Sequence, residues 1–148
     1  MISLLDVNVL VALAWPNHVH HPAALAWFRD QRSAGWATCP LTQSGFVRVS
    51  SNRNVIPEAR TPGEALHLLR RIVALPGHRF WADDVSIASA DEIDGTKLLG
   101  YRQVTDAHLL ALAIRRRGRL VTFDTGLRGL VPEAHSARDV VRVLSRGR

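Results

Sequence analysis

The stretch that decides the fold is Ile2-Ser3-Leu4-Leu5-Asp6, followed directly by Val7-Asn8-Val9-Leu10-Val11-Ala12-Leu13-Ala14. A short apolar run that ends in a carboxylate is typical of a buried strand in an α/β protein, where ligand groups lie at the carboxyl ends of the strands. The apolar residues that follow predict a helix over residues 8–14. We therefore expect Asp6 to lie at the carboxyl edge of a parallel sheet.

The same arrangement recurs near the other end of the chain. Asp124 ends a second short apolar run, Leu120-Val121-Thr122-Phe123. Asp106 stands at the start of an apolar segment that predicts a helix over residues 105–114, with Gly118 as its C-terminal cap. Because like charges repel strongly at short distance, three converging carboxylates need a bound cation or raised pKa values. Oxygen ligands of this kind favour Mg²⁺ or Mn²⁺ over Zn²⁺.

Each aspartate also has a purely structural interpretation. Asp6 could cap the helix that follows it, and Asp106 could be a helix cap or a first-turn acid. Asp124 could begin the turn at Thr125-Gly126. The joint pattern, rather than any single residue, predicts one cation site.

Strands and helices alternate along the rest of the chain, which predicts a parallel sheet between two helical layers. The segment over residues 82–100 contains five acidic residues and no long periodicity, and we expect it to be a solvated surface. Strands are expected over residues 2–5, 36–39, 78–81 and 119–123. Further helices are expected over residues 21–32, from Pro40 onward, and from Pro62 to residue 73. A short helix and an edge strand are expected in the remainder of the chain, up to Val143.

The composition is that of an ordinary globular protein, with 148 residues, 47% hydrophobic and 22% charged. This length fits one domain over residues 1–148. The lone Cys39 excludes a disulfide framework within the chain and a cysteine-based zinc cluster, and it favours a reducing compartment. No apolar stretch is long enough to cross a bilayer, so we expect a cytoplasmic protein without a membrane partner.

The formal net charge of +6 and the pI near 11.1 favour a polyanionic partner such as nucleic acid. Two observations weaken this inference. Every cationic residue except Lys97 is arginine, which a coding bias could explain, and the arginines at 115–117 and 119 could simply complement a helix dipole. Charge alone leaves the question open.

Four segments of the chain resemble PIN domains, specifically the VapC-type toxin ribonucleases of bacterial toxin–antitoxin pairs, and they occur in the expected order. They are Leu4-Leu5-Asp6-Val7-Asn8, residues 39–49 (CPLTQSGFVRV), Val104-Thr105-Asp106-Ala107-His108-Leu109, and Leu120-Val121-Thr122-Phe123-Asp124. The resemblance implies a three-layer α/β/α PIN-like fold with a central, mostly parallel sheet. It also implies a Mg²⁺-dependent endoribonuclease, with Mn²⁺ as a substitute, that cuts structured RNA such as transfer or ribosomal RNA. A VapB-type antitoxin and a homodimer are the implied partners.

The resemblance also assigns site residues. Asp6 and Asp106 match the principal metal-binding aspartates, and Asp124 matches a further acid of the centre. The family's usual glutamate at the start of the third helix falls on Gln43 here. The expected catalytic set is therefore Asp6, Asp106, Asp124 and Gln43, with the three aspartates as metal ligands.

Glutamine in place of glutamate removes one negative charge while keeping an oxygen that can bind a cation. With one divalent ion the net charge of the site becomes about −1 instead of about −2. We therefore expect weaker metal binding, and a second hypothesis is a catalytically weakened PIN scaffold that binds RNA or a protein without cutting.

Two alternative functions, an aspartyl phosphotransfer domain and a metal-free ribonuclease, would use aspartate or histidine residues of the kind that this chain contains. An aspartyl phosphotransfer domain usually needs a second aspartate two residues after the first, where this chain has Asn8. A metal-free ribonuclease that uses histidine as acid and base is conceivable with seven histidines, and activity that survives chelation would favour it.

Three aromatic residues near the amino terminus allow two interpretations. Trp15, Trp27 and Phe28 could pack in the core, or they could form an interface with an antitoxin or a second subunit. Core packing is the default for such side chains, and the sequence does not decide between the two.

Overall fold

The sheet is fully parallel. The computed structural model describes residues 1–145, and within them the strand order is β3-β2-β1-β4-β5 with four parallel pairings. Because β1 pairs with β2 on one side and with β4 on the other, the direction of winding reverses at β1. The strands are β1 (Ser3–Leu5), β2 (Trp36–Thr38), β3 (His78–Phe80), β4 (Arg119–Thr122) and β5 (Val141–Val143).

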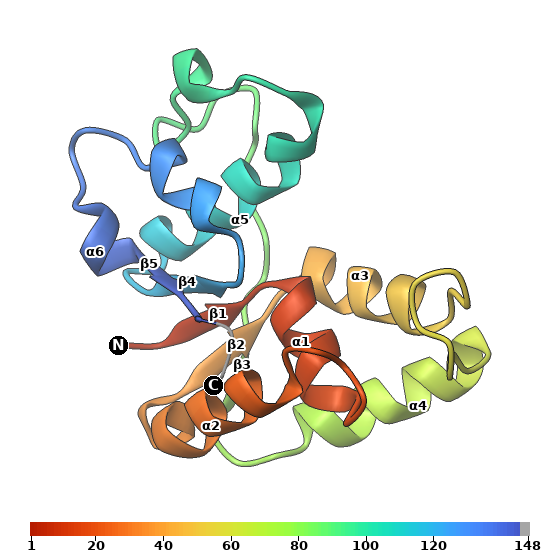
Figure 1. Ribbon diagram of the computed structural model, residues 1–148. Helices are drawn as coiled ribbons and strands as arrows, with labels where there is room; N and C mark the ends of the chain where they lie inside the picture. Colours follow the sequence, from red (N-terminus) through yellow and green to blue (C-terminus); the bar gives the residue numbers. More distant parts are fainter. Residues whose placement is uncertain (146–148) are drawn as a thin grey trace.

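Helices cover both faces of this sheet (Figure 1). One layer holds α1 (Val7–Ala14), α2 (His21–Gln31), α3 (Pro40–Ser50) and α4 (Pro62–Val73), and the opposite layer holds α5 (Val104–Arg115) and α6 (Ala137–Val140). The 3-10 turns are η1 (Arg32–Ala34), η2 (Gly95–Lys97), η3 (Tyr101–Gln103) and η4 (Thr125–Leu130). The predicted three-layer α/β/α architecture is confirmed.

The alternation of side chains along each strand produces two cores. Leu4 and Leu120 pack against α5, whereas their neighbours Leu5 and Val121 pack against α1 and α3. Successive side chains of a strand point to opposite faces, so a central parallel strand must be apolar throughout. This requirement explains why the strand segments were recognisable as short continuous apolar runs.

The predicted boundaries of the strands and helices agree with the structure to within a residue or so. Each of the four predicted strands is one residue shorter than expected, and Cys39 is a buried residue at the N-cap of α3 instead of a strand residue. The predicted start of α4 is confirmed, since the Thr61 hydroxyl accepts the N–H of Glu64 at 3.2 Å and Pro62 is the first helical residue. The short α6 and the edge strand β5 are also as predicted.

The predicted cap of α5 was wrong in detail. The residue with left-handed backbone is Arg117 (φ 56°), and the N–H of Gly118 bonds the carbonyl of Ala113 at 2.8 Å. Gly118 is needed for another reason. A Cβ atom there would lie 2.5 Å from the carbonyl oxygen of Ile2 and 2.6 Å from the Trp81 ring. This glycine lets the turn after α5 lie directly against the sheet.

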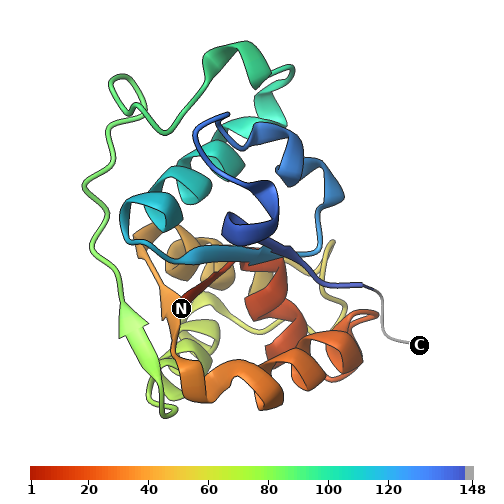
Figure 2. The same ribbon diagram turned by 90° about the vertical axis from the view of Figure 1, so that its left-hand side faces the viewer.

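The prediction for residues 82–100 was also wrong in part. Figure 2 shows this segment in green, as a long connection between β3 and the start of α5. Val85 is buried, and Ile93 and Leu98 pack against the core beneath α5. One of its acids, Glu92, pairs with Arg115 at 3.0 Å, whereas Asp84 and Asp91 are exposed, as predicted. The Arg116 guanidinium likewise donates to the carbonyl of Ala82 at 2.6 Å, so these arginines hold the connection in place.

None of the helices within residues 1–145 combines the length and the apolar character needed to cross a bilayer.

Candidate active site

The topology brings the three predicted aspartates to one edge of the molecule. Asp6 follows β1 directly, and Asp124 lies just beyond β4, the strand that pairs with β1. Asp106 belongs to the first turn of α5, which packs on the same two strands. Residues far apart in the sequence therefore meet where the winding of the sheet reverses, which is where open α/β sheets bind their ligands.

Asp6 is held by both of its carboxylate oxygens. Its side chain is only 7% exposed. Oδ1 accepts the backbone N–H of Val7 at 2.7 Å, and Oδ2 accepts the hydroxyl of Thr122 at 2.8 Å. The Thr122 oxygen in turn accepts the backbone N–H of Asp124 at 3.1 Å. The ends of β1 and β4 are thus tied together through one carboxylate and one hydroxyl.

The charges of the three carboxylates act on one another. Burial raises the pKa of Asp6, opposed by the hydrogen bonds from Thr122 and Val7, and the negative charge of Asp124 raises it further. Burial, followed by the charges of Asp6 and Asp124, raises the pKa of Asp106 to about 6. The three carboxylates therefore lie near enough to one another for their charges to interact.

The structural interpretations of these residues are partly correct as well. Asp6 does cap α1 with one oxygen, and Asp124 accepts the N–H of Gly126 at 2.8 Å in the turn that begins η4. Asp106 is the first-turn acid of α5, as its structural interpretation allowed, and it is not the cap, since the N-cap position is Gln103. Within residues 1–145 its carboxylate accepts no hydrogen bond. Asp106 is therefore a partly buried acid whose charge the surrounding residues do not compensate.

The donor set fits a hard divalent cation. Within residues 1–145, no three His, Cys, Asp or Glu side chains are already grouped as a metal-binding cluster. The three carboxylates nevertheless offer oxygen ligands of the type that Mg²⁺ and Mn²⁺ prefer. A bound cation would also remove the repulsion that raises the pKa of Asp106.

Comparison with known proteins identifies the family. A family model described as the PIN domain matches residues 3–130. The chain belongs to the PIN-domain family. Ribonuclease VapC39 of Mycobacterium tuberculosis is 53% identical over 127 residues, covering 86% of this chain and 91% of the relative. Ribonuclease VapC38 of the same organism is 55% identical over 125 residues, covering 84% of this chain and 86% of the relative.

A solved structure supports the same PIN-like fold. It is a chain of VapBC2 from Rickettsia felis, in a crystal structure bound to a DNA fragment from the promoter. The match has a TM-score of 0.68 at 10% sequence identity and covers 98% of this chain and 100% of that chain. At this identity the match concerns the fold alone.

Gln43, the position where the PIN resemblance expects a glutamate, lies near the start of α3. Its side-chain amide nitrogen donates to the hydroxyl of Thr38 at 3.0 Å, and that hydroxyl lies 2.7 Å from the Nε2 atom of His78. Thr38 is the last residue of β2, the other neighbour of β1. The structure therefore fixes Gln43 at the carboxyl end of the adjacent strand, with its amide nitrogen already engaged.

Two supporting residues of this PIN-type site were missed from sequence. Thr122 and Thr38 are fully buried hydroxyls at the last positions of β4 and β2, and they orient Asp6 and Gln43 respectively. A polar residue that closes a short apolar strand, two positions before Asp124 in one case and five before Gln43 in the other, is the signal that could have identified them. His108 forms a further contact on α5, with Nε2 2.7 Å from the Asp83 carboxylate.

Proposed function

We propose that this chain is a Mg²⁺-dependent endoribonuclease, the toxin of a toxin–antitoxin pair, that hydrolyses phosphodiester bonds in structured cellular RNA. Membership of the PIN-domain family and close relatives named ribonuclease VapC support this function. The observation that carries the metal dependence is the placement of three carboxylates at one edge of the sheet, after β1, after β4 and in the first turn of α5. Burial and the charges of Asp6 and Asp124 raise the pKa of Asp106 to about 6, which agrees with this placement. Perturbed acids that converge in this way are typical of functional sites.

Asp6, Asp106 and Asp124 would hold the ion, with Mn²⁺ able to replace Mg²⁺. Bound there, it would supply an activated water and would stabilise the negative charge of the phosphodiester. The hydrogen bond from Thr122 keeps the Asp6 carboxylate in a fixed orientation, so this side chain loses little further freedom when a cation binds. The Asp106 carboxyl must lose its proton to bind a cation, so metal binding weakens below about pH 6.

Gln43 is proposed as the neutral member of the catalytic set. Its amide nitrogen is bonded to Thr38, which leaves its oxygen as the atom that can face a ligand. Arg48 is exposed one turn further along α3, and it lines the same surface groove between α3 and α4 as Gln43. An RNA phosphate bound by Arg48 would lie close to Gln43.

The partners are proposed from the family. A VapB-type antitoxin would block the site, and the toxin would form a homodimer. The toxin would act in the cytoplasm on transfer or ribosomal RNA. A single PIN domain would span residues 1–148. The family model covers residues 3–130 of it. Residues 146–148 lie outside the part of the chain that the structure describes.

The second candidate function is a weakened PIN scaffold that binds RNA or a protein without cleavage. It is favoured by Gln43, which removes a negative charge from the site.

One experiment separates the two candidates. The purified protein is incubated with total RNA at increasing Mg²⁺ or Mn²⁺, beside Asp6→Asn and the matched control Asp91→Asn, whose exposed side chain lies in the 82–100 connection. The nuclease hypothesis predicts cleavage by wild type and Asp91→Asn, and its loss in Asp6→Asn and with EDTA. RNA binding without cleavage at any metal concentration would establish the scaffold instead, and cleavage in EDTA would remove the metal from the mechanism.

A further inference from the structure

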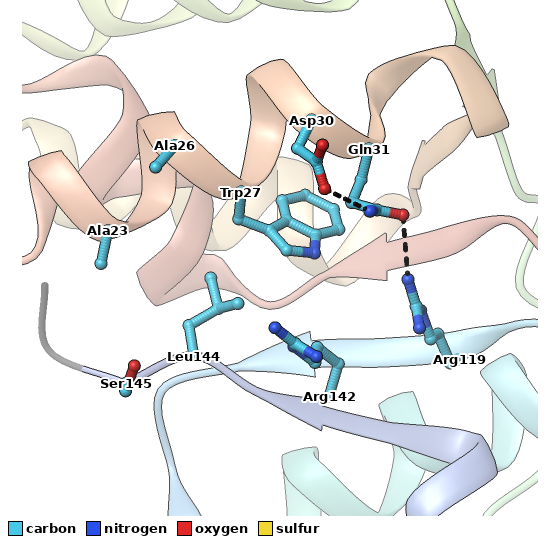
Figure 3. A pocket seen from close by; sticks show the side chains of 9 residues that line it. All are labelled: Ala23, Ala26, Trp27, Asp30, Gln31, Arg119, Arg142, Leu144 and Ser145. Carbon is cyan, nitrogen blue, oxygen red and sulfur yellow. Dashed lines mark hydrogen bonds between the residues drawn. The ribbon is translucent and has the colours of Figure 1, made fainter.

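A cavity of about 500 Å³ lies on the face of the sheet that carries α2 (Figure 3). It is bounded by α2 on one side and by β4, β5 and the residues that follow β5 on the other. Arg119, which begins β4, lies at the amino end of the strand, whereas Asp124 lies beyond its carboxyl end. The described lining of the cavity includes none of Asp6, Asp106 and Asp124, so the cavity is distinct from the site proposed for RNA cleavage.

Two arginines enter the cavity from the same face of the sheet. Arg142 pairs in register with Val121, and Arg119 lies two residues before Val121, so the two side chains are diagonal neighbours on one face. Like charges on neighbouring strands repel each other, and a bound anion would offset this repulsion. Burial, followed by the charge of Arg142, lowers the pKa of Arg119.

The neighbouring residues leave this charge largely uncompensated. Within residues 1–145, Arg119 donates only to neutral oxygens, the Ser3 hydroxyl at 3.1 Å and the Gln31 amide oxygen at 3.5 Å. Arg142 has no ion pair or hydrogen bond through its side chain within residues 1–145. Asp30 also lines the cavity, and its carboxylate already accepts the Gln31 amide at 2.7 Å. Two cations and one anion leave the cavity with a net positive charge.

A third donor lies beside the arginines. Trp27 is 7% exposed, and within residues 1–145 its buried indole nitrogen has no hydrogen-bond partner. Figure 3 shows the indole nitrogen on the side of the ring turned toward the two arginines. A buried N–H without an acceptor costs stability, and such groups are rare in native proteins. Trp27 itself lines the cavity, so a ligand bound there is the candidate acceptor for this nitrogen.

We propose that this cavity is an anion-binding site, in which Arg119, Arg142 and the indole N–H of Trp27 bind a phosphate or carboxylate group of a small ligand. Arginine forks bind both groups through paired hydrogen bonds. An oxygen anion would neutralise the arginine pair and supply the acceptor that Trp27 lacks. This inference goes beyond the proposed nuclease and does not depend on it.

The test uses inorganic phosphate as the probe, in EDTA and without RNA, so that nuclease activity does not enter. Calorimetric titration with phosphate, at ionic strength matched with sodium chloride, compares wild type with Arg142→Gln and Trp27→Phe. The matched control is Arg70→Gln, which removes an exposed arginine from α4. We expect wild type and Arg70→Gln to bind alike, and the other two variants to bind about tenfold or more weakly, since each loses one donor to the anion.

A spectroscopic readout separates a direct contact from altered folding. The indole N–H signal of Trp27 in a ¹H–¹⁵N NMR spectrum, identified by its absence in Trp27→Phe, is expected to shift as phosphate is added. Acetate serves as a second probe. A response to both anions assigns the site to carboxylates and phosphates alike, and a response to phosphate alone assigns it to phosphorylated ligands. An indole signal that does not move, or equal phosphate affinity in Arg142→Gln, would overturn the proposal.

Discussion

At the residue scale, the three aspartates are not equivalent. Asp6 has both oxygens hydrogen-bonded, and Asp124 has one oxygen in a turn. Asp106 accepts no hydrogen bond within residues 1–145 and carries the pKa of about 6. The repulsion among the three therefore falls most heavily on Asp106, and this residue determines how the site responds to pH and to metal.

Asp106 is expected to make the metal-free fold less stable as the pH rises. Its pKa is about 6 in the folded protein and 3.8 in the reference state, so the folded state binds the proton more tightly. Below about pH 4 both states are protonated, and between about pH 4 and 6 ionisation of the unfolded chain reduces the stability of the fold. Urea unfolding in EDTA should show Asp106→Asn equal to wild type near pH 4 and more stable by about 1–2 kcal/mol at pH 7, a value reduced from the full shift because this carboxyl is only partly buried.

Asp91→Asn is the control for this series, because its exposed carboxyl should produce no such trend with pH. A stability difference between Asp106→Asn and wild type that stays constant from pH 4 to 7 would show that the carboxylates do not repel one another.

Gln43→Glu is expected to strengthen metal binding. The added carboxylate increases the negative charge of the proposed site by one, so half-maximal RNA cleavage should need roughly threefold to tenfold less Mg²⁺. The measurement is a Mg²⁺ titration of cleavage by both proteins. Ser44→Glu is the control, since it adds the same charge at the next residue of α3 without replacing the Thr38-bonded amide. Identical Mg²⁺ dependence in wild type and Gln43→Glu would exclude position 43 from the metal site.

At the element scale, the site depends on how closely α5 and the strand after it lie against the sheet. Gly118 joins α5 to β4, and its position allows contact with the backbone of Ile2 and with the ring of Trp81. Since Asp106 is carried by α5 and Asp124 follows β4, a displacement at this junction would move two of the three acids.

Gly118→Ala is therefore expected to destabilise the protein by about 2–3 kcal/mol, because the new methyl group overlaps a carbonyl oxygen that cannot move easily. The matched control is Gly63→Ala in the first turn of α4, where a Cβ atom meets nothing within 4 Å. The control should be as stable as wild type or more stable by about 0.5–1 kcal/mol. Urea denaturation compares the three proteins, and equal midpoints for wild type and Gly118→Ala would show that the junction can relax.

At the scale of the whole molecule, charge is distributed unequally. The chain carries a net charge of +6, whereas the proposed catalytic edge gathers three acids. A positively charged surface attracts RNA, and the acidic edge without a metal repels its phosphates. RNA affinity should therefore depend on the basic surface and on salt.

Binding of a single-stranded RNA to Asp106→Asn in EDTA should weaken on the order of tenfold or more between about 50 and 200 mM salt, as expected when several phosphates are neutralised. Fluorescence anisotropy measures the affinity. Arg48→Gln should reduce the slope of log affinity against log salt by about 0.7, the contribution of one phosphate contact to a single strand. Arg138→Gln, on the opposite layer, should leave the slope unchanged. If Arg48→Gln and Arg138→Gln behave alike, the groove between α3 and α4 does not bind RNA.

Local sequence by itself determined most of the elements of this protein and the candidate acids. The apolar runs that end in Asp6 and Asp124 predicted buried parallel strands, because a central strand must be apolar on both faces. The cap at Thr61 was equally local, since its partner Glu64 is only three residues away. These features need no knowledge of distant contacts.

Only the tertiary structure decided how those elements support the site. The hydrogen bond from Thr122 to Asp6 joins residues 116 positions apart, and the bond from Gln43 to Thr38 depends on how α3 packs against β2. Residues 82–100 looked like solvated surface because their few apolar side chains lack periodicity, yet they cover α5 in the folded protein. Burial and long-range charge also raise the pKa of Asp106, and no local pattern encodes them, because both depend on what the rest of the fold brings beside that residue.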